Sequence, residues 1–216
     1  NIVDSSELTK LPEPTLMNVI EFADITGKTS ILRSVGTRLT DEYFAANPGV
    51  KAQLAVVTKD PDAMKTVQSA RKTGTLKPFQ QVKIGKACGR RGHKECAQQF
   101  LDDISPYSAV DDALLVDLAG LFIIANREDR GLPVYEEMRQ TRKSLNVQYG
   151  WAMLAAANGR AEDVSKWLDG ASEKELNNQI LLDLYFIADQ RDYHKLSRNV
   201  IERLYKRNPS DENEYY

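Results

Sequence analysis

Short polar breaks interrupt the sequence at nearly constant intervals, and each lies between two stretches whose apolar residues recur at helical spacing. The breaks centre on Gly27, Lys59, Gly92, Arg127, Gly159 and Arg191. Consecutive centres are 32, 33, 35, 32 and 32 residues apart. A period of this length, maintained along the chain, predicts an array of helical hairpins, in which each hairpin must stack on its neighbours to bury its apolar face.

Strand signals are nearly absent from the sequence. The run "AQLAVV" is the one short candidate, and it fits helical spacing better when read with its neighbours. Residues that cap helices stand at the breaks, and the pairs Asn47-Pro48 and Asn208-Pro209 are expected to end helices, which proline cannot continue. We therefore predict an all-α fold with about six hairpins, over residues 12–46, 49–73, 75–105, 109–142, 144–171 and 173–208.

Charge is balanced over the whole chain but uneven along it. The 216 residues contain 29 Lys and Arg against 31 Asp and Glu, a net charge of −2. Residues 71–98 hold eight basic residues and one acidic residue, whereas residues 99–140 hold three basic and nine acidic residues. Because the acidic segment would repel a phosphate backbone running along the array, nucleic acid is not an expected partner.

No apolar run approaches the length of a membrane helix, and the first twenty residues lack the pattern of a signal peptide. We therefore expect no direct membrane insertion of this part of the protein. The chain begins with Asn, and its closing stretch "NPSDENEYY" looks like the start of another element. These features indicate a piece of a longer protein.

The period and the pattern within the hairpins resemble the tetratricopeptide repeat. In the hairpin at 75–105, Ile84-Gly85 and Cys88 fall where that family has Leu-Gly and Tyr, and Ala97 and Leu101 match its second-helix Ala and large apolar residue. The resemblance implies one array over residues 1–216, a right-handed superhelical solenoid with a concave inner surface. Small residues would let paired helices approach closely, and large ones would fill the gaps between hairpins.

The stretch "CGRRGHKEC" contains both cysteines and is the most conspicuous candidate for chemistry. Cys88, Cys96 and His93 offer at most three soft ligands, whereas a structural zinc site needs four. A Cys-His nucleophile is also disfavoured, because Cys88 takes a core position of the repeat. A disulfide across the turn is geometrically possible in an oxidising compartment. The interpretation we favour is a solvated, basic hairpin turn.

Other apparent motifs do not amount to an active site. The run "ITGKTS" mimics the end of a phosphate-binding loop, but the first glycine of that motif is missing and no strand precedes it. Neighbouring carboxylates such as Asp102 and Asp103 point apart on a helix and cannot act together as acid and base. We predict no catalytic residue, metal or cofactor, and hence a protein that is not an enzyme.

The tetratricopeptide resemblance also implies a binding surface, because such arrays bind partners mainly with the first helix of each hairpin. Transferring these positions places Asn18 and Glu21 of the first hairpin on the concave side. The predicted partner-binding residues are Lys83, Lys86, Arg90, Asp117, Tyr149, Met153 and Tyr185. A basic cluster beside aromatic residues suits an extended acidic or carboxylate-bearing ligand. The alternative is that these side chains only solvate the groove.

The functional expectation is a scaffold that recruits partner proteins. Degenerate repeats and Ala-rich helices such as "YGWAMLAAANGR" are similar to the periplasmic repeat regions of bacterial exopolysaccharide export proteins. That resemblance implies a periplasmic location and, as partners, a polymer-modifying enzyme, another secretion component, or the polysaccharide itself. The alternatives are a cytoplasmic peptide-binding, co-chaperone or regulatory module and, third, an accessory domain of an enzyme.

Overall fold

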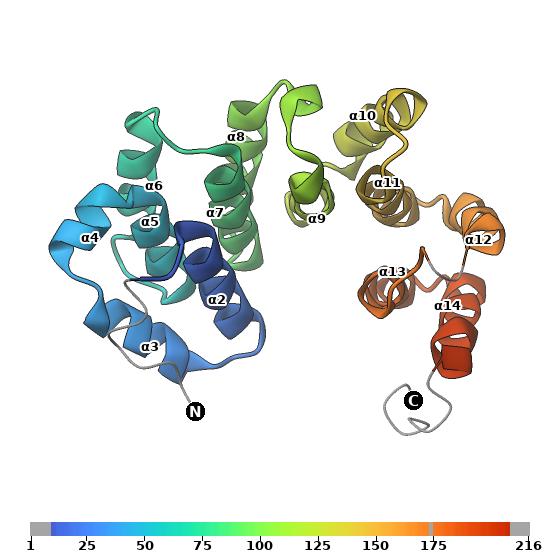
Figure 1. The fold of residues 1–216 in the computed structure, drawn as a ribbon, viewed down its shortest axis with the longest axis horizontal. Helices are drawn as coiled ribbons and strands as arrows, with labels where there is room; N and C mark the ends of the chain where they lie inside the picture. Colours follow the sequence, from blue (N-terminus) through green and yellow to red (C-terminus); the bar gives the residue numbers. More distant parts are fainter. Residues whose placement is uncertain (1–9, 173–174, 208–216) are drawn as a thin grey trace. The chain divides into compact units, whose positions relative to one another are not determined.

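A computed structural model describes residues 10–172 and 175–207 of the chain (Figure 1). Within these ranges the regular elements are helices, and no strand occurs, which confirms the all-α prediction. Pro209 and the closing stretch from residue 208 onward lie outside the described residues.

The chain divides into two compact units, at residues 1–110 and 111–216. The described part of each unit contains three helical pairs. The described helices of unit 1 are α2 (Glu13–Ile25), α3 (Thr29–Arg38), α4 (Asp41–Ala46), α5 (Pro48–Val57), α6 (Ala63–Lys72), α7 (Pro78–Arg90) and α8 (Lys94–Ile104). Unit 2 contains α9 (Leu115–Ile124), α10 (Glu128–Thr141), α11 (Leu145–Ala157), α12 (Ala161–Gly170), α13 (Asn178–Gln190) and α14 (His194–Arg207). Short 3₁₀ turns at Tyr107–Ala109 and Asp112–Leu114 precede α9.

Each predicted hairpin range holds a pair of helices, and the first range holds one helix more. The extra helix, α4, begins after Thr40, whose hydroxyl accepts a hydrogen bond from the backbone N–H of Tyr43 at 3.2 Å. It ends before Asn47, and Pro48 is then the first residue of α5. Proline is tolerated there because the first N–H groups of a helix have no partner within it.

The two helices of every pair are joined by a turn of the same backbone geometry, and this turn recurs with the period of the sequence. One residue in each turn has a φ between 55° and 85°: Gly27, Lys59, Gly92, Asn126, Gly159 and Asp192. These positions are 32, 33, 34, 33 and 33 residues apart. The residue that follows this position donates its backbone N–H to the carbonyl five residues before it, as Lys28 does to Ala23. The N···O distance is 2.8–2.9 Å in all six turns. This is the Schellman arrangement, which satisfies carbonyl groups that the end of a helix leaves unpaired.

The residue that accepts this hydrogen bond is buried in each hairpin and is small in most of them. It is alanine at Ala23, Ala55, Ala155 and Ala188, and otherwise Cys88 or Phe122. Phe122 is accommodated by Gly131 on the facing helix α10, where a Cβ would lie 2.7 Å from Cγ of Phe122. A large side chain on one helix is thus matched by a glycine on the other, which keeps the interior close-packed.

Within each unit, the first helices of successive pairs lie side by side. In unit 1, α2 contacts both α5 and α7, and α5 contacts α7; in unit 2, α11 lies between α9 and α13 (Figure 1). Each second helix packs against its own first helix, as in the α7–α8 and α13–α14 pairs. Every hairpin therefore shares apolar surface with another hairpin of its unit, as the repeat period requires.

Candidate functional site

The predicted basic trio of α7 meets a carboxylate of α2. Nζ of Lys83 lies 2.6 Å from Oε2 of Glu21, and Nζ of Lys86 lies 2.8 Å from Oε1 of the same carboxylate. Nη1 of Arg90 lies 3.1 Å from Oε1 as well. The steps of three and four residues along α7 place the three cations on one face of the helix, which is the face that packs toward α2.

A second carboxylate of α2 extends this arrangement toward the α7–α8 turn. Asp24 follows Glu21 by three residues, so it lies on the same side of α2. Oδ2 of Asp24 accepts a hydrogen bond from Nε of Arg90 at 3.2 Å, and Oδ1 accepts one from Nη2 of Arg91. The guanidinium of Arg91 also donates to the carbonyl of Val57, at the end of α5, at 2.7 Å. We call Glu21, Asp24, Lys83, Lys86, Arg90 and Arg91 the ion cluster.

Most of the ion cluster is shielded from water. The side chains of Glu21 and Asp24 are 9% and 3% exposed, and that of Lys83 is 10% exposed. Burial by itself would raise the pKa of Glu21, but Lys86 and Lys83 outweigh it and lower that pKa to about 2. Glu21 is therefore ionised over the whole physiological pH range, and it neutralises positive charge inside unit 1.

These contacts change the interpretation of the basic stretch. Lys83, Lys86 and Arg90 form ion pairs within the chain and join α2 to α7 across more than sixty residues of sequence. The arginines of "CGRRGHKEC" are likewise paired and only partly exposed, so they differ from the solvated basic turn that the sequence suggested. In that turn Gly92 and His93 are exposed.

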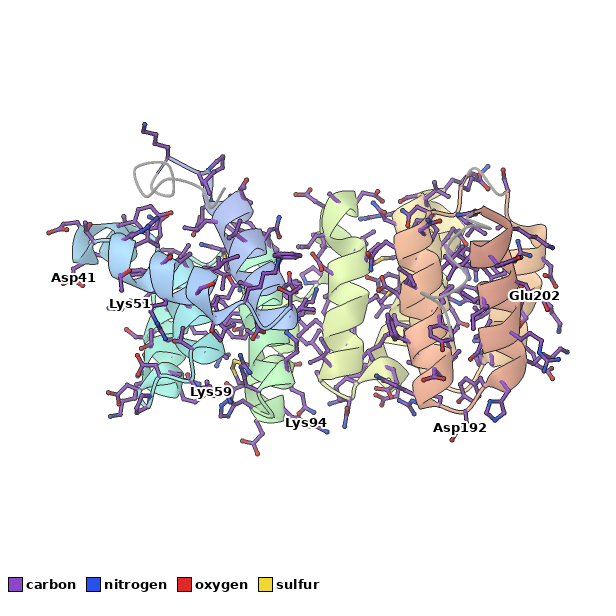
Figure 2. All side chains as sticks on the ribbon, turned by 90° about the horizontal axis from the view of Figure 1, so that it is seen from below. Asp41, Lys51, Lys59, Lys94, Asp192 and Glu202 are labelled. Atoms are coloured by element: carbon purple, nitrogen blue, oxygen red, sulfur yellow. A yellow bond between two sulfur atoms is a disulfide. The ribbon has the colours of Figure 1, made fainter. Side chains whose placement is uncertain are left out.

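Cys88 and Cys96 form a disulfide between α7 and α8, with their Cα atoms 6.0 Å apart. Cys88 is fully buried, at the position where most other hairpins have alanine. The bridge closes the turn in which Arg90 and Arg91 lie, so it fixes the part of the backbone that supplies half of the cluster's cations. Lys94, labelled in Figure 2, begins α8 directly after this turn.

Two of the predicted residues on α11 are buried within unit 2. Tyr149 and Met153 are 4% and 9% exposed. The Tyr149 hydroxyl donates to the carbonyl of Glu175, and its ring meets that of Trp167 edge-on, with centroids 6.2 Å apart. Burial raises the pKa of Tyr149, and the charge of Glu175 adds to this effect. These side chains stabilise unit 2 rather than line an open surface.

The last two predicted residues are more accessible. Asp117, on α9, is half-buried, and its charge adds to burial in raising the pKa of Tyr135. Tyr185, on α13, is also half-buried, and its ring lies 5.7 Å from that of Phe186 between centroids. Phe186 is 56% exposed. The pair therefore presents accessible aromatic surface on a first helix of unit 2.

Several residues with a clear structural role were missed by the sequence analysis. Asp24 and Arg91 belong to the ion cluster, and their spacing from Glu21 and Arg90 could have revealed them. In unit 2, the Arg139 guanidinium lies 3.7 Å from the centroid of the Trp151 ring. Burial lowers the pKa of Arg139, and Glu136 partly opposes this effect. No pattern in the sequence indicated that contact.

The described residues contain no cluster of three or more His, Cys, Asp or Glu side chains that could hold a metal ion. No helix among them is long and apolar enough to cross a lipid bilayer. Comparison with protein-family models, with curated proteins and with solved structures found no match to this chain.

Proposed function

We propose that this chain is a non-enzymatic, tetratricopeptide-like scaffold that recruits partner proteins with the first helices of its hairpins. The observation that carries the proposal is the recurrence of one turn geometry at intervals of 32 to 34 residues. Stacked hairpins of this length place first helices next to one another, as α9, α11 and α13 are in unit 2. Such a layer offers an extended surface rather than one deep pocket.

The partner surface that we propose differs from the predicted basic trio. Lys83, Lys86 and Arg90 are engaged with α2, whereas Tyr185 and Phe186 form an accessible aromatic pair on α13. Exposed aromatic side chains are typical anchors of protein interfaces. We therefore assign the protein contact to the α13 face, with the half-buried Asp117 of α9 as a further candidate.

The disulfide supports an oxidising compartment, because structural disulfides form and persist there and are rare in the cytosol. This favours the periplasmic export scaffold over a cytoplasmic regulatory module. In that setting the partners would be a polymer-modifying enzyme or another component of an exopolysaccharide secretion complex, with the polysaccharide in transit as a further ligand.

The proposal can be tested by placing a photo-crosslinking phenylalanine analogue at Phe186 in cells that make the whole protein. We expect discrete protein adducts that mass spectrometry identifies. The matched control is the same analogue at Glu137, an exposed residue on the second helix α10. Adducts of equal yield and identity from both positions, or none from Phe186, would contradict recruitment by the first helices.

A further inference from the structure

The last described helix, α14, differs in charge from the three second helices directly before it. Helices α8, α10 and α12 each carry two more carboxylates than cations. Helix α14 carries five Lys and Arg residues against one carboxylate, Glu202, and it begins with His194. Within unit 2 this helix therefore creates a local positive surface, although the whole chain is slightly acidic.

Two of these cations have partners inside unit 2. Arg203 pairs with Asp169 of α12 at 3.1 Å, and Arg207 donates to the carbonyl of Leu176 at 2.8 Å. The other three, Lys195, Arg198 and Lys206, are exposed and form no ion pair within the described part of the chain. Arginines 203 and 207 therefore anchor the helix, and the other three cations face solvent.

The three exposed cations line a groove along α14. One hollow, of about 350 Å³, is bounded by Lys195, Arg198, Lys206 and other residues of α14, with Asp169 of α12 on the opposite side. A second hollow, of about 460 Å³, continues from it between α12 and α14 and shares Asp169 and Lys195 with the first. Figure 2 labels Asp192, in the turn before α14, and Glu202, further along that helix.

The walls of the groove also carry carboxylates and neutral polar groups. The lining residues include four carboxylates beside the cations: Glu162 and Asp169 of α12, Asp192 in the turn and Glu202 of α14. A continuous polyphosphate would meet repulsion at each of them. A peptide with spaced carboxylates can instead pair these with the cations, while its backbone N–H groups donate to the carboxylates of the groove.

We propose that the α12–α14 groove binds an extended acidic segment of a protein partner, with Lys195, Arg198 and Lys206 as its carboxylate-binding residues. The proposal does not depend on recruitment at the first helices, because this groove lies between second helices of unit 2. Its occupant is defined by charge complementarity: spaced carboxylates with uncharged residues between them.

The test uses a fluorescein-labelled peptide of about twelve residues in which Asp or Glu alternates with Ser, and an oligothymidylate of about the same charge. Fluorescence anisotropy measures binding of each probe to the whole chain at about 50 mM and about 300 mM salt. We expect the peptide to bind more tightly than the oligonucleotide at low salt. Changing Lys195→Glu, Arg198→Glu and Lys206→Glu together should weaken peptide binding by at least about tenfold.

The matched control is the triple variant Lys51→Glu, Lys72→Glu and Lys94→Glu, which alters the net charge equally but on exposed positions of unit 1. It should keep peptide affinity within about twofold of the unmodified chain. Equal loss in both variants would show that only net charge matters and would overturn the proposal. Tighter binding of the oligonucleotide, or no binding of the peptide, would also overturn it. Circular dichroism of both variants checks that the helices are intact.

Sedimentation of the unlabelled chain distinguishes a second copy from a partner peptide as the occupant. A concentration-dependent dimer that the α14 triple variant abolishes would overturn the peptide assignment. A monomer that still binds the peptide agrees with it.

Discussion

The two units of the chain use the same hairpin turn but hold neighbouring hairpins together differently. In unit 1, α2 and α7 are joined by Glu21 and Asp24 with four cations, and a disulfide closes the α7–α8 turn. Unit 2 also has ion pairs between hairpins, such as Arg191 with Glu128 and Arg160 with Glu136, but their arginines are 46% and 40% exposed. Its buried contacts between hairpins are aromatic. The Tyr135 ring packs on Gly150, and Arg139 stacks on Trp151. The repeat period therefore sets the turn and leaves the chemistry between hairpins free to vary.

This difference has energetic consequences. A buried ion cluster depends on the ionisation of its carboxylates, and losing one member leaves the others desolvated and uncompensated. The stability of the aromatic contacts in unit 2 depends on how well their shapes fit, because a close-packed interior tolerates added atoms poorly. Both tryptophans, Trp151 and Trp167, belong to unit 2, so their fluorescence reports on that unit alone.

The largest effect is expected from Gly150→Ala. A Cβ at this position would overlap with Cε1 of Tyr135, whose ring is fully buried and whose hydroxyl donates to the carbonyl of Leu115. The ring cannot shift without losing that hydrogen bond, so unit 2 should be destabilised by about 4 kcal/mol. Urea unfolding followed by tryptophan fluorescence measures this change.

Gly36→Ala is the matched control, because it lies within helix α3 and its Cβ would meet only Cδ2 of Leu54 at an ordinary 3.6 Å. This substitution should stabilise unit 1 by up to about 1 kcal/mol, as alanine is the better helix former, and hydrogen exchange of peptides from α3 in urea measures the change. If the two substitutions had similar effects on stability, the close contact of Gly150 would have no energetic role.

The next effect is the response of unit 1 to acid. The pKa of Glu21 is lowered from an ordinary 4.5 to about 2, so its ionised form stabilises the fold fully above about pH 4.5. This contribution, about 3 kcal/mol, is lost as the pH falls from about 4.5 to about 2. Glu21→Gln should therefore cost about 3 kcal/mol near neutral pH and almost nothing near pH 2.

Urea unfolding of unit 1, followed by hydrogen exchange of peptides from α2 and α7, measures the difference between Glu21→Gln and the unmodified chain at each pH. Glu95→Gln, at an exposed position of α8, is the control and should have little effect at any pH. A Glu21→Gln deficit that persists unchanged in acid would contradict an electrostatic role for the cluster.

A smaller effect, also confined to unit 1, is expected from reduction. The disulfide closes a loop with a sequence separation of 8, and in the chain-entropy model such a loop contributes about 2.5 kcal/mol. Dithiothreitol should therefore speed hydrogen exchange in α7 and α8 and leave tryptophan fluorescence unfolding unchanged. The double variant Cys88→Ala and Cys96→Ala should not respond to the reductant. Equal loosening of α11 would remove the contrast between the units.

The sequence was sufficient to predict the all-α class, since hydrophobic spacing and the absence of strand signals are local properties. It also located the breaks to within one residue of the positive-φ positions, as at Arg127 against Asn126. The site was harder to predict, because a sequence shows which charges share a helix face but not what packs against it. The carboxylate that pairs with Lys83, Glu21, is sixty-two residues away on α2, and no local pattern marks that pairing.

Tyr149 and Met153 were predicted to bind a partner but are buried, again because a sequence does not show what packs against a helix. Their positions were transferred from a resemblance, whereas their burial depends on the neighbouring Trp167 and on the chain around Glu175. Long-range packing is set by side-chain volumes from several elements together, and a single sequence does not reveal it.

The uniform turn bears on how such a chain can change in length. Because each turn has the same hydrogen bond to the carbonyl five residues back and one residue in the left-handed conformation, a whole hairpin could be duplicated or deleted without redesign of the joints. Such a rearrangement would, however, disrupt the contacts between neighbouring hairpins. A hairpin with Glu21 and Asp24 placed beside the aromatic helix α11 would bury these carboxylates without cations. Duplication in this protein is therefore limited by the compatibility of adjacent faces rather than by the backbone.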